Sequence, residues 1–134
     1  SSIKKRRYII NISSISGKFV TSQSPSYNIT KAALLHMSNY FATLGKKYNC
    51  NTNALLPGLI IQKRHSKNFN SKDNKTFKKK AISSLNVNNI GKEIDICNMI
   101  SFLISGKADF INGEQLVIDG GSSISEQLNL LLNF

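Results

Sequence analysis

Short apolar runs alternate with longer amphipathic stretches along this chain. Three runs end at turn residues, as buried strands do: residues 7–12 (RYIINI), 51–56 (NTNALL) and 115–118 (QLVI). Between them, apolar residues recur at helical spacing from about residue 25 to 47 and again from 91 to 106. Strands that alternate with helices of this length predict βα units on a parallel sheet, an α/β fold.

The residues at the ends of these elements are typical of helix caps and turns. Pro25 suits the first turn of the long helix, and Ser24 or Ser26 is placed to cap it. Pro57-Gly58 stops the second strand. Residues 62–80 are polar and rich in lysine, which indicates a mobile loop with one short helix.

No repeat or linker divides the chain, so residues 1–134 are expected to form one domain, or part of one, with a tail at 122–134. The chain opens without an initiator Met and runs almost at once into a strand, as if its beginning were missing. A hydrophobic content of 40% supplies a core. No stretch approaches the roughly 20 apolar residues of a membrane span.

Cys50 and Cys97 form no metal-ligand cluster, and no metal site is expected. Two reduced, buried thiols fit a cytoplasmic protein.

The net charge of +11 raises the question of nucleic acid, because phosphate contacts need Lys and Arg. The distribution argues against it. Residues 4–7 form a short run before a strand, Lys46-Lys47 suit a helix C-terminus, and eight more basic residues lie from 63 to 80 among Asn and Ser. A solvated basic surface is the favoured interpretation, followed by an anionic substrate or cofactor, with nucleic acid last.

Three side chains suggest proton-transfer chemistry. Tyr27 and Lys31 share one helix face at positions i and i+4. An ammonium beside a phenol favours the phenolate. Ser14, at the end of the preceding strand, is placed to hydrogen-bond the same reacting oxygen. Such a trio suits proton transfer to or from a carbonyl or an alcohol.

Four landmarks in order resemble the C-terminal half of the short-chain dehydrogenase/reductase family. They are Asn11-Ile12-Ser13-Ser14-x-x-Gly17, Tyr27-x-x-x-Lys31, Asn53-Ala54-Leu55-Leu56-Pro57-Gly58 and the closing segment 110–121 (FINGEQLVIDGG). Each alone is a weak signal, but the ordered set is specific. The resemblance implies a Rossmann-like, doubly wound parallel sheet, of which this chain would supply the C-terminal half with about three strands.

The resemblance also implies a site. Tyr27 would be the general acid/base, Lys31 would support it and hydrogen-bond the nicotinamide ribose, and Ser14 would orient the carbonyl. Pro57-Gly58 and the main chain of Ile60 would contact the nicotinamide. The cofactor would be NAD or NADP, and the substrate a small carbonyl or alcohol. Residues 62–80 would form a substrate-lid loop, and the basic 63–80 segment favours an anionic substrate.

Spacing from Gly17 and Tyr27 selects Ser14 over Ser13. Strand alternation would send the two serines to different sides, so only one faces the site. Asn53 is interpreted as a structural hydrogen-bonding residue, and His36 and His65 as surface or packing residues.

The resemblance further implies a homo-oligomer, a dimer or tetramer, with the 25–47 helix at one interface. Leucines of the 122–134 tail would pack on a neighbouring subunit.

Two departures from the family pattern stand out. Gln62 occupies the place of a Thr that touches the cofactor diphosphate, and no glycine-rich turn of the TGxxxGxG kind occurs in the sequence. The upstream Asn of the family's catalytic tetrad is missing as well. The chain is therefore expected to be the second half of a longer protein. The alternative is a truncated, non-catalytic module that acts in oligomerisation or interaction; a basic nucleic-acid binder is the third interpretation.

Overall fold

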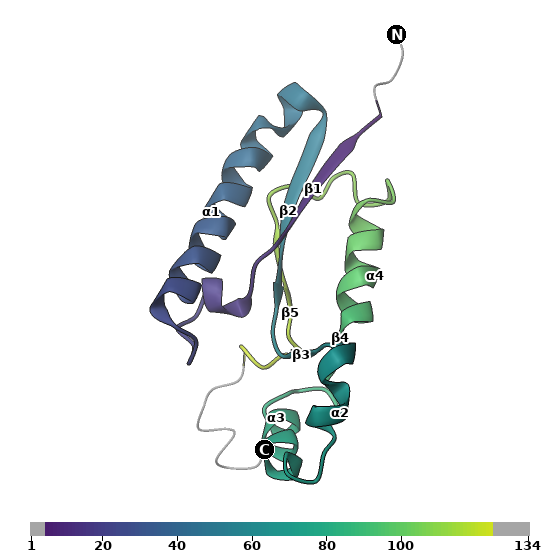
Figure 1. Cartoon of the computed structure of the whole chain (residues 1–134). Coiled ribbons are helices and arrows are strands. Elements are labelled where there is room, and N and C mark those ends of the chain that lie inside the picture. Colours follow the sequence, from purple (N-terminus) through teal and green to yellow (C-terminus); the bar gives the residue numbers. More distant parts are fainter. Residues whose placement is uncertain (1–4, 125–134) are drawn as a thin grey trace.

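A parallel sheet lies between two helices in the computed structural model, which describes residues 5–124 (Figure 1). The strands of the main sheet are β1 (Arg7–Ile12), β2 (Cys50–Pro57) and β5 (Gln115–Ile118), in the order β1-β2-β5. Helices α1 (Pro25–Tyr48) and α4 (Glu93–Leu103) cover opposite faces of it. The remaining elements are a 3₁₀ turn η1 (Ile15–Gly17), a 3₁₀ turn η2 (Lys63–His65), α2 (Ser66–Phe69), α3 (Lys75–Ser83), β3 (Ile60–Ile61) and β4 (Gly91–Lys92).

The central strand β2 pairs in parallel with both of its neighbours. Because both of its faces are covered, residues 51–56 are all buried. Successive side chains point to opposite faces of the sheet, so the strand feeds two cores. One core joins Ala54 and Leu56 to Leu35 of α1; the other joins Leu55 to Leu103 and Ala108. The predicted α/β, Rossmann-like half-sheet of three strands is confirmed.

Helix α1 begins and ends as its sequence predicts. The Ser24 side chain accepts a hydrogen bond from the Tyr27 N–H, and Pro25 occupies the first turn. At the other end Asn49 adopts a left-handed conformation (φ 48°) and its N–H bonds to the Gly45 carbonyl. The helix thus extends one residue beyond the predicted 25–47.

The segment after β2 is more regular than the sequence pattern predicts. The expected loop at 62–80 contains η2, α2 and most of α3, which are held together by buried Phe69 and Ala81. The helix predicted from residue 91 starts at Glu93, because Gly91 and Lys92 pair with Ile60 and Ile61 as a two-residue parallel ladder.

The cysteine prediction is wrong in part. Cys97 lies on the exposed side of α4 and Cys50 is half-buried, although both are free thiols. The helical spacing of residues 91–106 predicts that Cys97 is one of the buried apolar positions. In the observed, shorter helix Leu103 is buried and Cys97 is exposed to solvent. The leucines of the predicted tail contact lie outside the described residues.

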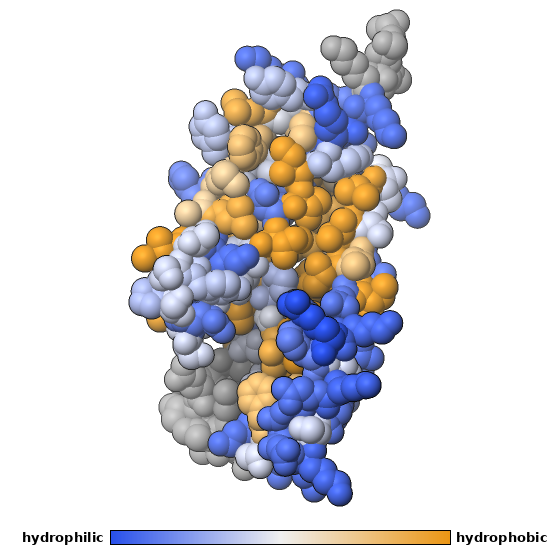
Figure 2. Space-filling view, in the orientation of Figure 1, coloured by the Kyte–Doolittle hydropathy of each residue, from blue (hydrophilic) through white to orange (hydrophobic). Residues whose placement is uncertain are grey.

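Strand β1 forms one edge of the three-stranded sheet in the part of the chain that the structure describes. Ile9 and Ile12 are 38% and 41% exposed there. Figure 2 shows apolar side chains gathered on this face, between α1 and α4. The face is therefore an apolar surface along an unpaired strand.

Candidate active site

The predicted site residues follow the carboxyl ends of parallel strands. The Ser13 N–H donates to the Leu55 carbonyl (2.8 Å), which continues the ladder just beyond β1. At the end of β2, Pro57 is in register with Ile118, the last residue of β5. Parallel strands end at the same edge of a sheet, where α/β proteins bind their ligands. Ser14 and Pro57-Gly58 therefore belong to one edge.

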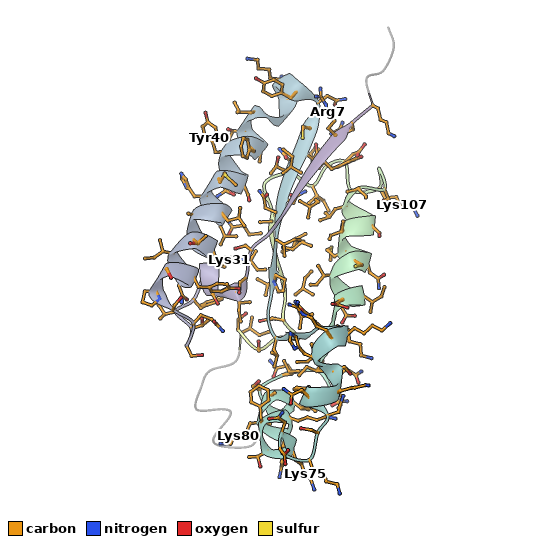
Figure 3. The ribbon with its side chains drawn as sticks, viewed as in Figure 1. Arg7, Lys31, Tyr40, Lys75, Lys80 and Lys107 are labelled. Atoms are coloured by element: carbon orange, nitrogen blue, oxygen red, sulfur yellow. The ribbon has the colours of Figure 1, made fainter. Side chains whose placement is uncertain are left out.

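Tyr27 and Lys31 come together on the first turns of α1. The Lys31 Nζ lies 5.6 Å from the centroid of the Tyr27 ring, within cation–π range. The same Nζ donates a hydrogen bond to the Ile12 carbonyl (3.0 Å), the last carbonyl of β1. Figure 3 shows Lys31 on the part of α1 that lies beside this strand end. Tyr27 is 39% exposed, so its hydroxyl is accessible to a substrate.

The two serines make different contacts. The Ser13 hydroxyl donates to the Lys31 carbonyl (2.9 Å), which ties the helix backbone to the end of the strand. Ser14 caps η1, accepting from the Ser16 N–H (3.2 Å) and donating to the Ser16 hydroxyl (3.2 Å). Sequence reasoning treated Ser13 only as the rejected candidate and did not find its tethering role.

Gly17 brings η1 directly against α1. A Cβ at this position would lie 2.8 Å from the Lys31 carbonyl oxygen and 3.0 Å from Leu35 Cδ1. Backbone cannot move aside as a flexible side chain can, so only glycine fits here. The glycine in the first landmark was the sequence signal for this close approach.

Asn28, next to Tyr27, was also missed. Its side-chain oxygen accepts from the Thr21 N–H (3.2 Å), and its amide nitrogen donates to the carbonyls of Gln23 and Ser24 (both 3.0 Å). These bonds hold the loop that leads into α1 beside the tyrosine. A short polar amide in a first helical turn is the sequence signal for such a contact.

Gly58 packs against the turn that follows β5. Its N–H donates to the Ile118 carbonyl (3.0 Å), and a Cβ on it would lie 2.6 Å from the Cβ of Asp119. The Pro57-Gly58 turn is therefore fixed by the neighbouring strand end.

Asp119 organises the turn after β5. Its carboxylate accepts from the N–H groups of Gly121 (2.9 Å) and Ser123 (2.8 Å) and from the Ser122 hydroxyl (3.1 Å). Burial alone raises the pKa of Asp119, but the hydrogen bonds from Ser123, Gly121 and Ser122 outweigh it, so the pKa lies below its ordinary value. Asp119 therefore has a structural role in this turn.

Ile60 lines two neighbouring cavities, of about 520 Å³ and about 280 Å³. Gln62 lies at the mouth of the larger one, where its side-chain oxygen accepts a hydrogen bond from Arg64 Nε (2.6 Å). The segment after the Pro57-Gly58 turn therefore borders space that a ligand can enter.

The residues present fit the nicotinamide end of a dinucleotide. An ammonium has three protons, and among the described residues Lys31 uses one of them on Ile12, so donors remain for ribose hydroxyls. No glycine-rich diphosphate turn exists in this sequence. The fit therefore extends to the reacting end only.

Comparisons with known proteins identify related dehydrogenases and reductases. The family model described as "Enoyl-(Acyl carrier protein) reductase" matches residues 2–123. A 7alpha-hydroxysteroid dehydrogenase from Bacteroides fragilis is 34% identical over 87% of this chain and 43% of its own length. A dehydrogenase/reductase SDR family member 4 from Mus musculus is 36% identical over 72% of this chain and 33% of its own length. The chain spans less than half the length of these relatives.

Solved structures share the fold. A 4-hydroxyisoleucine dehydrogenase mutant complexed with NADH and succinate superposes with a TM-score of 0.80 at 30% identity, covering 91% of this chain and 49% of that chain. A putative 2-deoxy-d-gluconate 3-dehydrogenase from Agrobacterium tumefaciens with bound NADP gives 0.76 at 25% identity, covering 90% and 48%. None of the helices within residues 5–124 is long and apolar enough to cross a membrane.

Proposed function

This chain belongs to the short-chain dehydrogenase/reductase family, and we propose that it carries the catalytic half of an NAD(P)-dependent oxidoreductase. The enzyme would interconvert a hydroxyl and a carbonyl on a small molecule. The cofactor would supply or accept the hydride. This chain would supply the proton and the groups that orient the substrate.

The proposed roles follow from the contacts of each residue. Tyr27 is accessible and acts as general acid/base on the substrate oxygen. Lys31 holds its ammonium against the Tyr27 ring and offers its remaining protons to ribose. Ser14 donates to the substrate oxygen once its weak 3.2 Å bond to Ser16 is exchanged. The Pro57-Gly58 turn and Ile60 flank the nicotinamide.

One observation carries the proposal. Lys31 contacts the Tyr27 ring and the carbonyl of Ile12 at the same time, two residues before Ser14. These two contacts hold the Lys31 ammonium between the tyrosine and the end of β1, and a proton-transfer site needs its groups in such a fixed relation.

The substrate is proposed to be anionic. Residues 63–80 carry eight basic side chains and a single carboxylate, Asp73. A positive segment raises the local concentration of anions. The related 4-hydroxyisoleucine dehydrogenase mutant is complexed with succinate, a dicarboxylate, which agrees with this choice.

Replacing Tyr27 with Phe in the full-length protein tests the proposal. We expect turnover to fall by about 10²- to 10⁴-fold, the usual contribution of a positioned proton-transfer group. Tyr40→Phe is the matched control, since Tyr40 lies on the same helix and is 61% exposed. Unchanged turnover in Tyr27→Phe would reject the assignment.

A second candidate function is favoured by the unpaired edge of β1. The chain would then be a non-catalytic module whose β1 edge, along which Ile9 and Ile12 are exposed, pairs with a partner. The reading frame upstream of Ser1 separates the two candidates. An in-frame glycine-rich strand–turn–helix supports the enzyme, and a start codon directly before Ser1 supports the module.

A further inference from the structure

The cavity of about 520 Å³ between β3 and the helices α2 and α3 has two kinds of wall. Phe69 and Phe77 line an apolar side, and Gln62, Arg64 and His65 line a polar side. A volume of this size suits a small organic ligand, since ligand cavities span about 300–1,000 Å³. The mixture of walls predicts a ligand with an apolar part and a polar end.

The apolar wall is built by two aromatic rings. Phe69 and Phe77 pack edge to face, with centroids 6.1 Å apart and planes at 85°. Phe69 is only 7% exposed, so it is fixed in the small core of this segment, while Phe77 is 54% exposed. The pair offers one anchored ring and one open ring to an apolar body.

The polar wall is centred on Arg64. Its Nε donates to the Gln62 side-chain oxygen at 2.6 Å, which orients the guanidinium. No carboxylate lies within 4.0 Å of it in the described part of the chain, where the single ion pair joins Arg6 and Asp109. Both terminal nitrogens of the guanidinium thus keep their donors for a ligand.

The surroundings reinforce a preference for anions. Among the described residues no lysine lines the cavity itself, but residues 63–80 carry seven lysines, and Figure 3 shows two of them, Lys75 and Lys80, on α3. Figure 2 shows the same region as strongly hydrophilic. Arg64 and Glu93 both line a second, open groove with Gln62 and Lys63, and the two side chains form no ion pair in the described part of the chain. The local field at the cavity is therefore positive.

We propose that this cavity binds an oxyanion, a phosphate or a carboxylate, through the Arg64 guanidinium held by Gln62, with the apolar part of the same ligand packed on Phe69 and Phe77. A guanidinium holds such groups by two parallel hydrogen bonds. The oxyanion belongs either to the substrate or to the dinucleotide. That assignment rests on the proposed function, whereas binding itself does not.

Titration of the ¹⁵N-labelled 134-residue chain by NMR tests the proposal, with the backbone amide signals of residues 60–69, which remain in every variant, as reporters. The probes are sodium octanoate, with sodium acetate for comparison, and sodium pyrophosphate. We expect Arg64→Gln to lower the affinity for the bound probe by about tenfold or more, because the substitution removes a charge-assisted hydrogen bond. Lys79→Gln is the matched control, because this exposed lysine of the same segment does not line the cavity. Circular dichroism checks that each variant keeps its helices.

The pattern of binding identifies the source of the oxyanion. Octanoate binding more tightly than acetate indicates a substrate with an apolar body, and pyrophosphate alone indicates the dinucleotide. Arg64→Lys keeps the charge without the planar fork and is expected to bind at an intermediate level, even if Arg64→Gln does not fold. Binding that is equal in the Arg64 and Lys79 variants, or absent for every probe, overturns the proposal. Tyr27→Phe is expected to bind the probes as tightly as the parent, because Tyr27 does not line the cavity. Probe binding and turnover are therefore separate readouts, and failure of the catalytic assignment would not by itself reject the proposed anion site.

Discussion

Two adjacent buried residues of β2 are expected to respond in opposite ways to loss of their polar groups. Asn53 is 1% exposed; its amide nitrogen donates to the Ile111 carbonyl (3.0 Å) and its oxygen accepts from the Glu114 N–H (2.9 Å). Thr52 is 0% exposed, and its hydroxyl has no partner among the described residues. Asn53→Leu removes two bonds, and Thr52→Val removes an orphaned hydroxyl.

The magnitudes follow from these contacts. Two hydrogen bonds contribute about 1 kcal/mol each, and a donor left without a partner adds about 1–2 kcal/mol more, so Asn53→Leu is expected to cost about 3–4 kcal/mol. Thr52→Val is expected to lie within about 1 kcal/mol of the parent or to be more stable, since burying an unbonded hydroxyl is itself unfavourable. The backbone bonds of Thr52, to the Asn112 side chain and from the Gly113 N–H, are unchanged by the substitution.

Urea unfolding followed by far-ultraviolet circular dichroism measures both variants. With a slope of about 1–3 kcal/mol per molar urea, the Asn53→Leu loss shifts the midpoint by about 1–4 M. The slope itself must stay constant for the comparison to hold. A Thr52→Val variant as destabilised as Asn53→Leu would refute the reasoning, because it would mean that the hydroxyl contributes as much as the paired amide.

Two further predictions concern the site and its supporting turn. Gly17→Ala places a Cβ 2.8 Å from the Lys31 carbonyl oxygen, so we expect the free energy of unfolding to fall by about 1–3 kcal/mol. In the full-length enzyme we also expect kcat, measured by steady-state kinetics, to fall by about tenfold or more. A parent-like kcat would contradict the packing argument. The pKa of Asp119 lies below its unfolded value of 3.8, so its stabilisation is present above that pH and is lost as the pH falls through the lower folded pKa. The urea midpoint should therefore fall less between pH 7 and pH 3 in Asp119→Asn than in the parent. An equal fall in both proteins would contradict this role of Asp119.

The elements that the sequence predicts well are those with a long periodic signal. Strand β5 and the long helix α1 match within one residue, because turn residues and Ser24 mark their ends. Strand β2 is one residue longer at each end than predicted, because its pairing with both neighbours continues past the apolar run. The local pattern and the tertiary structure agree wherever a segment is buried by the sheet.

The 62–92 segment was less predictable for a physical reason. A two-residue ladder such as β3–β4 has no period to detect. Helix α3 consists largely of lysines, which form helices well but resemble a solvated loop by hydropathy. Its place depends on the burial of Ala81, a contact that only the folded chain provides.

The candidate site divides in the same way. The i, i+4 spacing was enough to predict that Tyr27 and Lys31 lie together. The tether from Ser13 to the Lys31 carbonyl depends on how closely α1 packs against the end of β1, a distance that spacing does not encode. Sequence pattern thus finds groups that share an element, and packing decides which groups join two elements.

The proposed proton-transfer residues and the proposed ligand-binding residue lie on parts of the chain that differ in how well they are packed. The residues proposed for proton transfer are anchored to β1 and α1, which pack on the fully buried β2, so their geometry is held by the best-packed part of the chain. The proposed ligand-binding residue Arg64 lies on the segment between β3 and β4, whose two-residue ladder is a sheet separate from β1-β2-β5, and this segment has a core of few side chains. Sparse anchoring gives low local stability, so this segment opens more readily than the catalytic part. Substitutions in residues 62–80 should therefore change which ligand binds, whereas substitutions around Lys31 should change how fast it reacts.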